Sequence, residues 1–453
     1  MTSVANHARI RPATPDDAEA IASAHVSSWQ AAYRGLLPQD VIDRNDLASR
    51  TATWRRILAA RSDVLVAEAA DHTILGFAGL SPSRDEDGDP ATTGEVQAIY
   101  LAPPAWGQGT GRELMAAAVA RLASTGFTRA TLWVLDTNAR ARRFYEAAGW
   151  SPDGATKSDD RHGTPITEVR YARPLPPHAS QAGTWRLGDL TVRRMGFGAM
   201  RLGEQTGRAV EVLRRAVDLG VNHIDTAAFY FSANELIRRA LAPYPDDLVI
   251  TTKVWPGRHA SGEWYWASPA QLRGQVEENL RALGRDHLDV VNLRVPPSGS
   301  TGSIAGHFAA LAELRDQGLI GHLGVSNVTP AHVAEALAIA PVVCVQNRYG
   351  VGAAPAEHDF VDACGAQGIA YTPFFAIATS DPEPAAITET AAAHGATAAQ
   401  VRLAWTLQRG SHVLAIPGTG NPGHLAENVA AATLRLTDDE MALITTVAKP
   451  QET

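Results

Sequence analysis

Short apolar runs alternate with amphipathic stretches along the second half of the chain. The runs lie near residues 195–199, 223–227, 248–254, 288–294, 320–326, 342–347, 369–373 and 412–417. Each run has the length of a buried strand, and the stretches between them have the periodicity of helices that cover a sheet. Eight strand–helix units in succession predict a parallel sheet that closes into a (β/α)8 TIM barrel. Side chains that carry chemistry are then expected at the carboxyl ends of the strands.

The first part of the chain mixes strands and helices in a different order. Strands are predicted at residues 9–12, 64–68, 74–80, 95–101 and 131–135, and helices from Thr14 and near 39–60, 109–124 and 142–150. Residues 174–184 then combine prolines with small polar residues, which is typical of a linker. We therefore predict an α/β domain at residues 8–173, a linker at 174–184 and the barrel at 185–448.

Composition narrows the class of protein. Of the 453 residues, 45% are apolar, which is enough for two packed cores. The net charge of -8 argues against a general nucleic-acid surface. Two cysteines, Cys344 and Cys364, cannot form a disulfide scaffold or a cysteine-rich metal site. The chain starts without a signal peptide and has no membrane-spanning run. We expect a cytoplasmic protein that acts on small molecules, with no metal and an oligomeric state that the sequence leaves open.

Three polar residues follow two of the predicted barrel strands. Asp225 directly follows Ile224 in the run at 223–227, Tyr230 comes five residues later, and Lys253 lies near the end of the run at 248–254. All three are expected at one mouth of the sheet. A lysine ammonium beside a phenol favours the phenolate and makes the phenol a better proton donor, and an aspartate would hold the lysine. The alternative is a structural Asp–Lys pair beside a packed tyrosine.

These residues resemble the aldo-keto reductases, which have an Asp-Thr-Ala strand, a tyrosine acid and a Thr-Lys strand in this order and at this spacing. The segment at 324–327, Gly-Val-Ser-Asn, is similar to the same family. The resemblance implies oxidoreduction between a carbonyl or alcohol and NADP(H), or NAD(H), in the barrel. For the nicotinamide, it implies that Ser326, Asn327 and Gln346 hold the amide and that Tyr371 stacks on the ring. For the adenosine half, it implies that the phosphates are wrapped by Pro417, Gly418, Thr419 and His424 and that Glu427 and Asn428 lie near the adenine.

The chain departs from this family at two places. Arg294 stands where a catalytic histidine is expected. Arginine donates hydrogen bonds but does not release its proton, so we expect weak reduction of generic aldehydes and a bias to acidic or polar substrates or to alcohol oxidation. The alternative is that Arg294 forms a salt bridge and the site is catalytically empty. Gly418-Thr419 and His424 replace the Lys-Ser and Arg that often select NADP. We therefore expect the barrel to prefer NADPH over NADH only modestly.

A glycine-rich turn organises the first domain. Gly107, Gly109 and Gly111 follow the strand at 95–101 and open a helix. Such a turn exposes backbone N–H groups at a positive helix end and can cradle phosphate, although it also serves close packing. The later segment from Asn138 through Phe144-Tyr145 to Gly149-Trp150 makes the domain similar to the GNAT acyltransferases.

That resemblance implies acetyl transfer from acetyl-CoA to an amine. The pyrophosphate would be held by Gln108, Gly109, Gly111 and Arg112, the pantetheine arm would pair with Ile99 and Leu101, and Asn138 would contact the cofactor. Tyr145 would protonate the leaving thiolate, and Glu95 would accept the amine proton. Tyr145 as a packed aromatic and Glu95 as a solvated carboxylate remain alternatives. Trp106 departs from the Arg or Gln that usually opens the loop, which removes one phosphate-facing side chain.

The sequence as a whole predicts a bifunctional fusion of an N-acetyltransferase and an aldo-keto reductase. One alternative keeps the acetyltransferase and makes the barrel a nucleotide-binding regulator with little redox turnover. Another makes the whole chain a ligand-sensing scaffold. The aromatic loop at 258–266 either closes over a flat substrate or covers the barrel rim.

Overall fold

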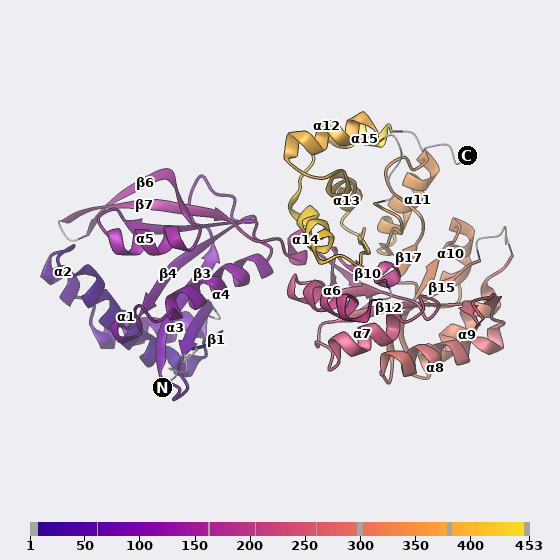
Figure 1. Ribbon diagram of the computed structural model, residues 1–453, viewed down its shortest axis with the longest axis horizontal. Coiled ribbons are helices and arrows are strands. Elements are labelled where there is room, and N and C mark those ends of the chain that lie inside the picture. The colour runs from indigo at the N-terminus through magenta and orange to yellow at the C-terminus, as the bar shows by residue number, and fades with distance from the viewer. Residues whose placement is uncertain are drawn as a thin grey trace. The chain divides into compact units, whose positions relative to one another are not determined.

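The computed structural model describes residues 8–60, 62–161, 164–203, 205–259, 261–296, 302–377 and 383–447. The chain divides into two compact units, Met1–Pro176 and Pro177–Thr453 (Figure 1). The predicted end of the barrel, at residue 448, lies outside the described ranges. No helix in these ranges is long and apolar enough to cross a membrane.

The first unit is built on a seven-stranded sheet in the order β1-β2-β3-β4-β5-β7-β6. The strands are β1 (Arg9–Pro12), β2 (Asp63–Glu68), β3 (Ile74–Pro82), β4 (Thr93–Leu101), β5 (Arg129–Leu135), β6 (Ser151–Arg161) and β7 (Thr164–Pro174). All neighbours pair antiparallel except β4 and β5. The predicted strands before residue 136 are confirmed.

Helices cover both faces of this sheet. They are α1 (Ala18–Tyr33), α2 (Gln39–Asp43), α3 (Leu47–Ala59), α4 (Thr110–Ser124) and α5 (Ala139–Ala147). Alternate residues of β2 separate the two cores: Val64 and Val66 pack with α1 and α3, whereas Leu65 packs with α4. The single helix predicted at 39–60 is wrong. Asp46 accepts a hydrogen bond from the backbone N–H of Ser49 and starts α3 as a separate helix.

The parallel pair β4–β5 leaves a gap in the sheet of the first unit. The two strands are paired only between Thr93–Glu95 and Arg129–Thr131. Beyond Glu95, no residue of β4 is paired with β5, although both strands continue. Unpaired strand edges present free N–H and C=O groups. A gap with hydrogen-bonding walls therefore opens between the second halves of β4 and β5.

The second unit is the predicted barrel. Its parallel strands are β10 (Phe197–Gly198), β11 (His223–Asp225), β12 (Val249–Val254), β15 (Leu288–Arg294), β16 (Ile320–Ser326), β17 (Cys344–Gln346) and β18 (Ala370–Tyr371), in that order. The eighth predicted run closes the circle through two parallel bridges, Tyr371 with Val413 and Met195 with Ala415. The (β/α)8 architecture is confirmed.

Helices surround the strands (Figure 1). They are α6 (Thr206–Asp218), α7 (Ala233–Leu241), α8 (Leu272–Leu283), α9 (Ala305–Asp316), α10 (Pro330–Leu337), α11 (Pro355–Ala366), α12 (Ala385–His394), α13 (Ala398–Gln408), α14 (Pro422–Ala430) and α15 (Asp438–Thr445). Short 3-10 turns are η1 (Pro15–Asp17), η2 (Pro103–Ala105), η3 (Ala179–Ala182), η4 (Ala199–Arg201), η5 (Pro269–Gln271) and η6 (Ala431–Thr433).

The interior of the barrel changes from apolar to polar along its axis. At one end, Val249, Val290 and Cys344 pack with a hairpin formed by β8 (Thr184–Leu187) and β9 (Leu190–Arg193). Further along the same strands the buried positions are polar, among them Asp225 and Lys253. Because inward positions recur every second residue, each strand places its final inward side chain at the same mouth.

Residues just before the barrel belong to it structurally. Ala179 and Ala182 of η3 are buried in the barrel core, and the N–H of Ala179 donates to the carbonyl of Leu219. Arg194 is half-buried and donates to the carbonyl oxygens of Ala182, Gly410 and Val413. This unit therefore begins near Pro177, inside the segment that the composition suggested as a linker.

Candidate active sites

A buried ion pair lies at the barrel mouth. Lys253 Nζ donates to Asp225 Oδ2 at 2.6 Å and to the carbonyl of Thr226 at 3.0 Å. The side chains of Lys253 and Asp225 are only 1% and 4% exposed. Burial lowers the pKa of Lys253, but Asp225 and Tyr230 outweigh it, and the pKa lies above the ordinary lysine value. The lysine is therefore a fixed ammonium.

Tyr230 stands beside this ammonium. Lys253 Nζ lies 4.8 Å from the centroid of the Tyr230 ring. The phenol follows β11 in the loop that leads to α7, and Phe229 packs edge-on against it with ring centroids 5.0 Å apart. The structure thus brings the predicted Asp225, Tyr230 and Lys253 together, in a geometry suited to proton transfer at the phenol.

Arg294 ends β15 at the same mouth. Its Nη1 donates to Ser326 Oγ at 3.1 Å, and its guanidinium lies 5.1 Å from the Phe374 ring centroid. No carboxylate of the described chain is within ion-pairing distance of Arg294. The salt bridge considered for this residue is therefore not formed there, and the guanidinium keeps donors available for a ligand.

Gln346 connects these groups. Its Nε2 donates to Asp225 Oδ1 at 2.8 Å, and Ser326 Oγ donates to its Oε1 at 3.4 Å. Asp225 therefore has a partner on each oxygen. Asn327 adopts a left-handed backbone (φ 58°) and its Nδ2 donates to the carbonyl of Val295. Ser326 and Asn327 lie at the end of β16, behind the residues that line the cavity.

A cavity joins the predicted catalytic residues to part of the predicted nucleotide segment. It is lined by Asp225, Tyr230, Lys253, Arg294, Gln346, Pro417 and Gly418, together with Gly198, Met200, Arg201, Pro373, Phe374, Phe375, Ala376, Ile377 and Ile416. Thr419, His424, Glu427 and Asn428 are not in this lining; the last three belong to α14. Their roles toward the adenosine half stay predictions.

Tyr371 is placed elsewhere. It is 1% exposed and packs against Tyr349 and Phe360 in the core between strands and helices. Its neighbour Ala370 points into the barrel instead. The ring therefore faces away from the cavity, and the aromatic residues that line the cavity on this segment are Phe374 and Phe375. The expected position of Tyr371 over a nicotinamide does not agree with this arrangement.

The cavity has features that suit a dinucleotide. A Cβ added to Gly418 would lie 2.4 Å from the carbonyl oxygen of Gly198, so one wall consists of closely packed backbone. α14 begins at Pro422, just beyond this wall, and a helix N-terminus favours phosphate. The closely packed backbone wall and the helix start therefore fit a nicotinamide dinucleotide.

An aromatic rim lies near this cavity: Trp264 and Trp266 belong to the predicted aromatic loop at 258–266, whereas sequence reasoning missed Phe231 and Phe375. Phe231, Trp264, Trp266 and Phe375 are all at least 43% exposed. Phe231 and Phe375 also have left-handed backbones, with φ of 56° and 63°. Aromatic residues rarely adopt this conformation, and such strain is found mainly at functional sites. The rim therefore offers flat apolar surfaces around the mouth.

The first unit has a second cavity, of about 380 Å³, in the gap between β4 and β5. Ligand sites span about 300–1,000 Å³. The predicted residues Ile99, Leu101, Gly109, Gly111, Arg112, Asn138 and Tyr145 line it, as do Tyr33, Tyr100, Trp106, Trp133 and Arg140. The N–H groups of residues 107–109 donate to no acceptor in the described chain. Unpaired strand edges, a free N–H loop and this size fit acetyl-CoA.

Tyr145 is almost fully buried in this cavity, beside Phe144 and Tyr171. Burial strongly raises the pKa of the Tyr145 phenol, and Tyr33 raises it further. The phenol therefore stays protonated at any working pH. It can donate a proton to a thiolate, although its position is also that of a packed core aromatic.

Two predicted residues lie outside this cavity. Glu95 is buried and its carboxylate accepts two hydrogen bonds from Arg84, at 2.9 and 3.1 Å. An ion-paired carboxylate away from the cavity is a poor proton acceptor for an amine. The side chain of Gln108 turns back onto its own loop, where Nε2 donates to the carbonyl of Pro104. Any contact of Gln108 with phosphate is left to its backbone.

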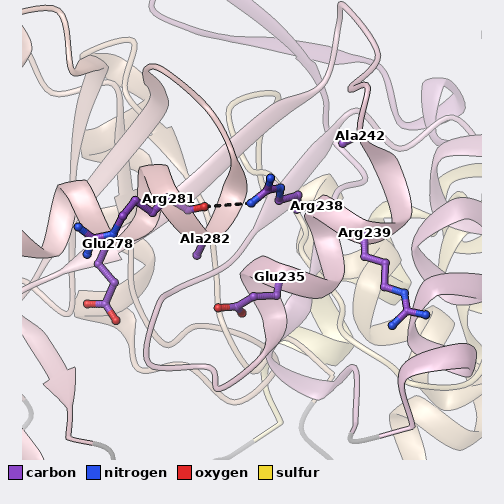
Figure 2. A pocket seen from close by; sticks show the side chains of 7 residues that line it. All are labelled: Glu235, Arg238, Arg239, Ala242, Glu278, Arg281 and Ala282. Atoms are coloured by element: carbon purple, nitrogen blue, oxygen red, sulfur yellow. Dashed lines mark hydrogen bonds between the residues drawn. The ribbon is translucent and has the colours of Figure 1, made fainter.

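A further, open cavity of about 570 Å³ lies away from both groups of residues. Figure 2 shows it between α7 and α8, lined by Glu235, Arg238, Arg239, Ala242, Glu278, Arg281 and Ala282. Arg238 donates to the carbonyl of Arg281 across it. Its charged side chains belong to the outer helices, and none of the predicted catalytic residues reaches it. This open cavity between α7 and α8 therefore contains none of the predicted site residues.

Comparison with known families agrees with this division into two sites. The Acetyltransferase (GNAT) family model matches residues 28–150, and the Aldo/keto reductase family model matches residues 194–449, more than half of the chain. The chain belongs to the aldo-keto reductase family and carries a GNAT acetyltransferase domain before the barrel. The predicted fusion is confirmed, and with it acetyl transfer and oxidoreduction as the general activities of the two families.

Individual relatives cover the length of the barrel. Pyridoxine 4-dehydrogenase of Escherichia coli (strain K12) is 45% identical over 284 residues, 59% of this chain and 99% of that protein. An uncharacterized oxidoreductase of Schizosaccharomyces pombe is 34% identical over 60% of this chain and 92% of its own length. A solved thermostable aldo-keto reductase in complex with the inhibitor epalrestat is 29% identical, with a TM-score of 0.52, over 58% of this chain and 98% of that one.

Proposed function

We propose that the barrel oxidises a primary alcohol on a flat ring, with pyridoxine as the first substrate to test, and reduces the corresponding aldehyde. NADP(H) is the proposed cofactor, with NAD(H) as a weaker substitute. The observation that carries this proposal is the phenol of Tyr230 beside the buried Lys253–Asp225 pair. The aromatic rim and the likeness to a pyridoxine 4-dehydrogenase support the choice of substrate.

The chain's own residues handle the proton in this reaction. When bound, the nicotinamide exchanges a hydride with the carbon that carries the oxygen. Tyr230 donates its proton to the carbonyl oxygen in reduction and accepts the alcohol proton in oxidation. Lys253 stabilises the phenolate form by its positive charge, and Asp225 with Gln346 keeps the ammonium in place.

Arg294 adds a second cation to this mouth. It donates hydrogen bonds but cannot relay a proton, so it stabilises negative charge on the substrate oxygen without replacing the usual histidine as an acid. Because Arg294 cannot supply a proton to a carbonyl oxygen, we expect alcohol oxidation to be favoured over reduction of generic aldehydes.

The test is pyridoxine oxidation with NADP⁺ and with NAD⁺, followed as formation of the reduced nicotinamide. We expect turnover with both, and a preference for NADP⁺ well below about a thousandfold, which corresponds to ~4 kcal/mol. The variant Tyr230→Phe is the matched control. Absence of oxidation and of pyridoxal reduction in the wild-type chain would refute the substrate, and turnover that survives Tyr230→Phe would refute the mechanism.

We propose further that the first unit acetylates a small-molecule amine. The loop at 107–111 and Arg112 would hold the acetyl-CoA diphosphate, the edge of β4 at Ile99 and Leu101 the pantetheine arm, and Tyr145 would protonate the thiolate. A thiol-release assay over a panel of amines tests this activity. Binding of acetyl-CoA without acetylation of any amine would favour a sensing role for the unit.

A further inference from the structure

An arginine from α5 lies over the residue that breaks the phosphate-loop pattern. The guanidinium carbon of Arg140 is 3.7 Å from the centroid of the Trp106 ring. The Trp106 ring is itself fixed, because its Nε1 donates to the carbonyl of Leu101, at the end of β4, at 2.8 Å. A guanidinium at this distance from an indole is held by cation–π attraction.

Arg140 is well placed to bind an anion. It occupies the first turn of α5, directly after Asn138, whose side-chain oxygen accepts from the N–H of Ala141 and fixes the start of the helix. Arg140 has no carboxylate partner among the described residues. Both Arg140 and Trp106 line the first-unit cavity beside Gly107, Gly109 and Arg112.

We propose that Arg140, stacked on Trp106, is a binding residue for the diphosphate of acetyl-CoA and supplies the cation that the loop itself lacks. This inference rests on the proposed acetyl transfer. Stacking engages one face of the guanidinium and leaves its N–H edge free, and that edge matches two phosphate oxygens. Trp106 is then a positioning residue, and the departure from the family pattern moves the cation from the loop to the facing helix.

The test compares acetyl-CoA affinity of Arg140→Ala and Arg143→Ala by calorimetry on the full chain. Arg143 is an exposed arginine of the same helix that does not line the cavity, so its loss changes the net charge equally. We expect Arg140→Ala to bind about tenfold more weakly, which corresponds to ~1.4 kcal/mol, and Arg143→Ala to match wild type. Equal affinities for the two variants would overturn the proposal.

Two ligand analogues locate the contact. The same ratio is expected with 3′-dephospho-acetyl-CoA, which keeps the diphosphate, and no difference between variants is expected with S-acetylpantetheine, which lacks it. A penalty that disappears with the dephospho compound would place Arg140 on the 3′-phosphate and overturn the assignment. Wild-type chain that binds none of the three ligands would instead refute the proposed acetyl transfer, and this inference with it.

A rescue experiment tests the role of Trp106. Introducing Trp106→Arg into the Arg140→Ala variant puts a cation back into the loop, and we expect most of the lost affinity to return. Trp106→Ala alone should weaken binding nearly as much as Arg140→Ala, and the double alanine variant should be little worse than either. Additive losses, with thermal unfolding unchanged, would show that stacking does not position Arg140.

Discussion

The two units place a tyrosine at the centre of their cavities, in opposite surroundings. Tyr145 is buried among aromatic side chains, and burial raises its pKa. Tyr230 is half-buried beside an ammonium that is itself held by two hydrogen bonds. A coenzyme A thiolate is a good leaving group and needs only a neutral acid, whereas an alcohol must lose a proton to a base. The neighbours of each phenol match these separate demands.

This difference has a structural cause in each fold. The barrel can bury an ion pair at its mouth because successive parallel strands direct their last inward residues to one place. The first unit offers a gap between diverging strands, which is lined mainly by apolar and aromatic side chains and by free backbone groups. The phenol of Tyr230 therefore stands beside a charge, whereas the phenol of Tyr145 is shielded from water.

The largest effect is expected from the ion pair. Lys253→Met removes the ammonium beside Tyr230 and should lower oxidoreductase turnover by about 10²–10⁴-fold. Acetyl transfer by the same chain should not change, since Lys253 belongs only to the barrel. The measurement is the rate of both reactions in one preparation.

The unfolding free energy of Lys253→Met separates the catalytic role of the ion pair from its role in packing. Lys253→Met leaves Asp225 buried without its cation, so the barrel should lose about 3–5 kcal/mol of unfolding free energy. Adding Asp225→Asn should restore part of that loss but none of the turnover. Recovery of turnover in the double variant would mean that the pair only supports the fold.

If the two units are independent, the barrel should begin at Pro177 and include η3. A barrel expressed as residues 177–453 should be more stable than one expressed as 185–453, because the shorter one lacks η3. Three hydrogen bonds to η3, including that from Arg194 to Ala182, would be lost, at about 1 kcal/mol each. Denaturant unfolding of the two fragments measures the difference, and equal stability would show that η3 belongs to a linker.

Arg294 should shift the direction of catalysis. Arg294→His replaces a fixed cation by a group that can donate a proton, so reduction of generic aldehydes should rise relative to alcohol oxidation, by about tenfold. Arg294→Gln, which keeps donors but no charge, serves as the control and should lose activity in both directions. An unchanged ratio of the two rates in the histidine variant would contradict the role given to the arginine.

A smaller effect is expected from a buried histidine in the first unit. His25 packs between Trp54, Phe77 and Tyr100, and burial lowers its pKa to about 4. The unfolded chain binds this proton near pH 6.5, so the stability that neutral His25 contributes is present above that pH and is lost as pH falls toward 4. Residues 1–176 should lose about 1 kcal/mol between pH 7.5 and 5.5. The same titration of His25→Gln should be flatter.

Strand ends were the part of the site that the sequence could predict. Asp225, Arg294 and Gln346 each end a strand and Lys253 is the last residue but one of β12, and parallel topology brings such positions to one mouth. The direction of the Tyr371 side chain could not be predicted, because β18 has only two residues, too few to show which one faces inward. Ala370 does, so the aromatic ring points to the helices.

Contacts between distant segments could not be read in the same way. From the sequence, Glu95 has the position of a free strand carboxylate, but Arg84, in the loop between β3 and β4, forms an ion pair with it. Trp106 looked like a lost phosphate contact, although Arg140 lies on its ring. Neither pairing leaves a periodic signal, since each depends on how two loops or a loop and a helix meet in space.

The central claim is that one chain carries two active sites, each dependent on its own tyrosine. The most direct measurement is the rate of acetyl transfer and of pyridoxine oxidation in full-length Tyr145→Phe and Tyr230→Phe. We predict that Tyr145→Phe lowers only acetyl transfer and that Tyr230→Phe abolishes only oxidation. Retention of both rates in both variants, or loss of both rates in either properly folded variant, would contradict the account.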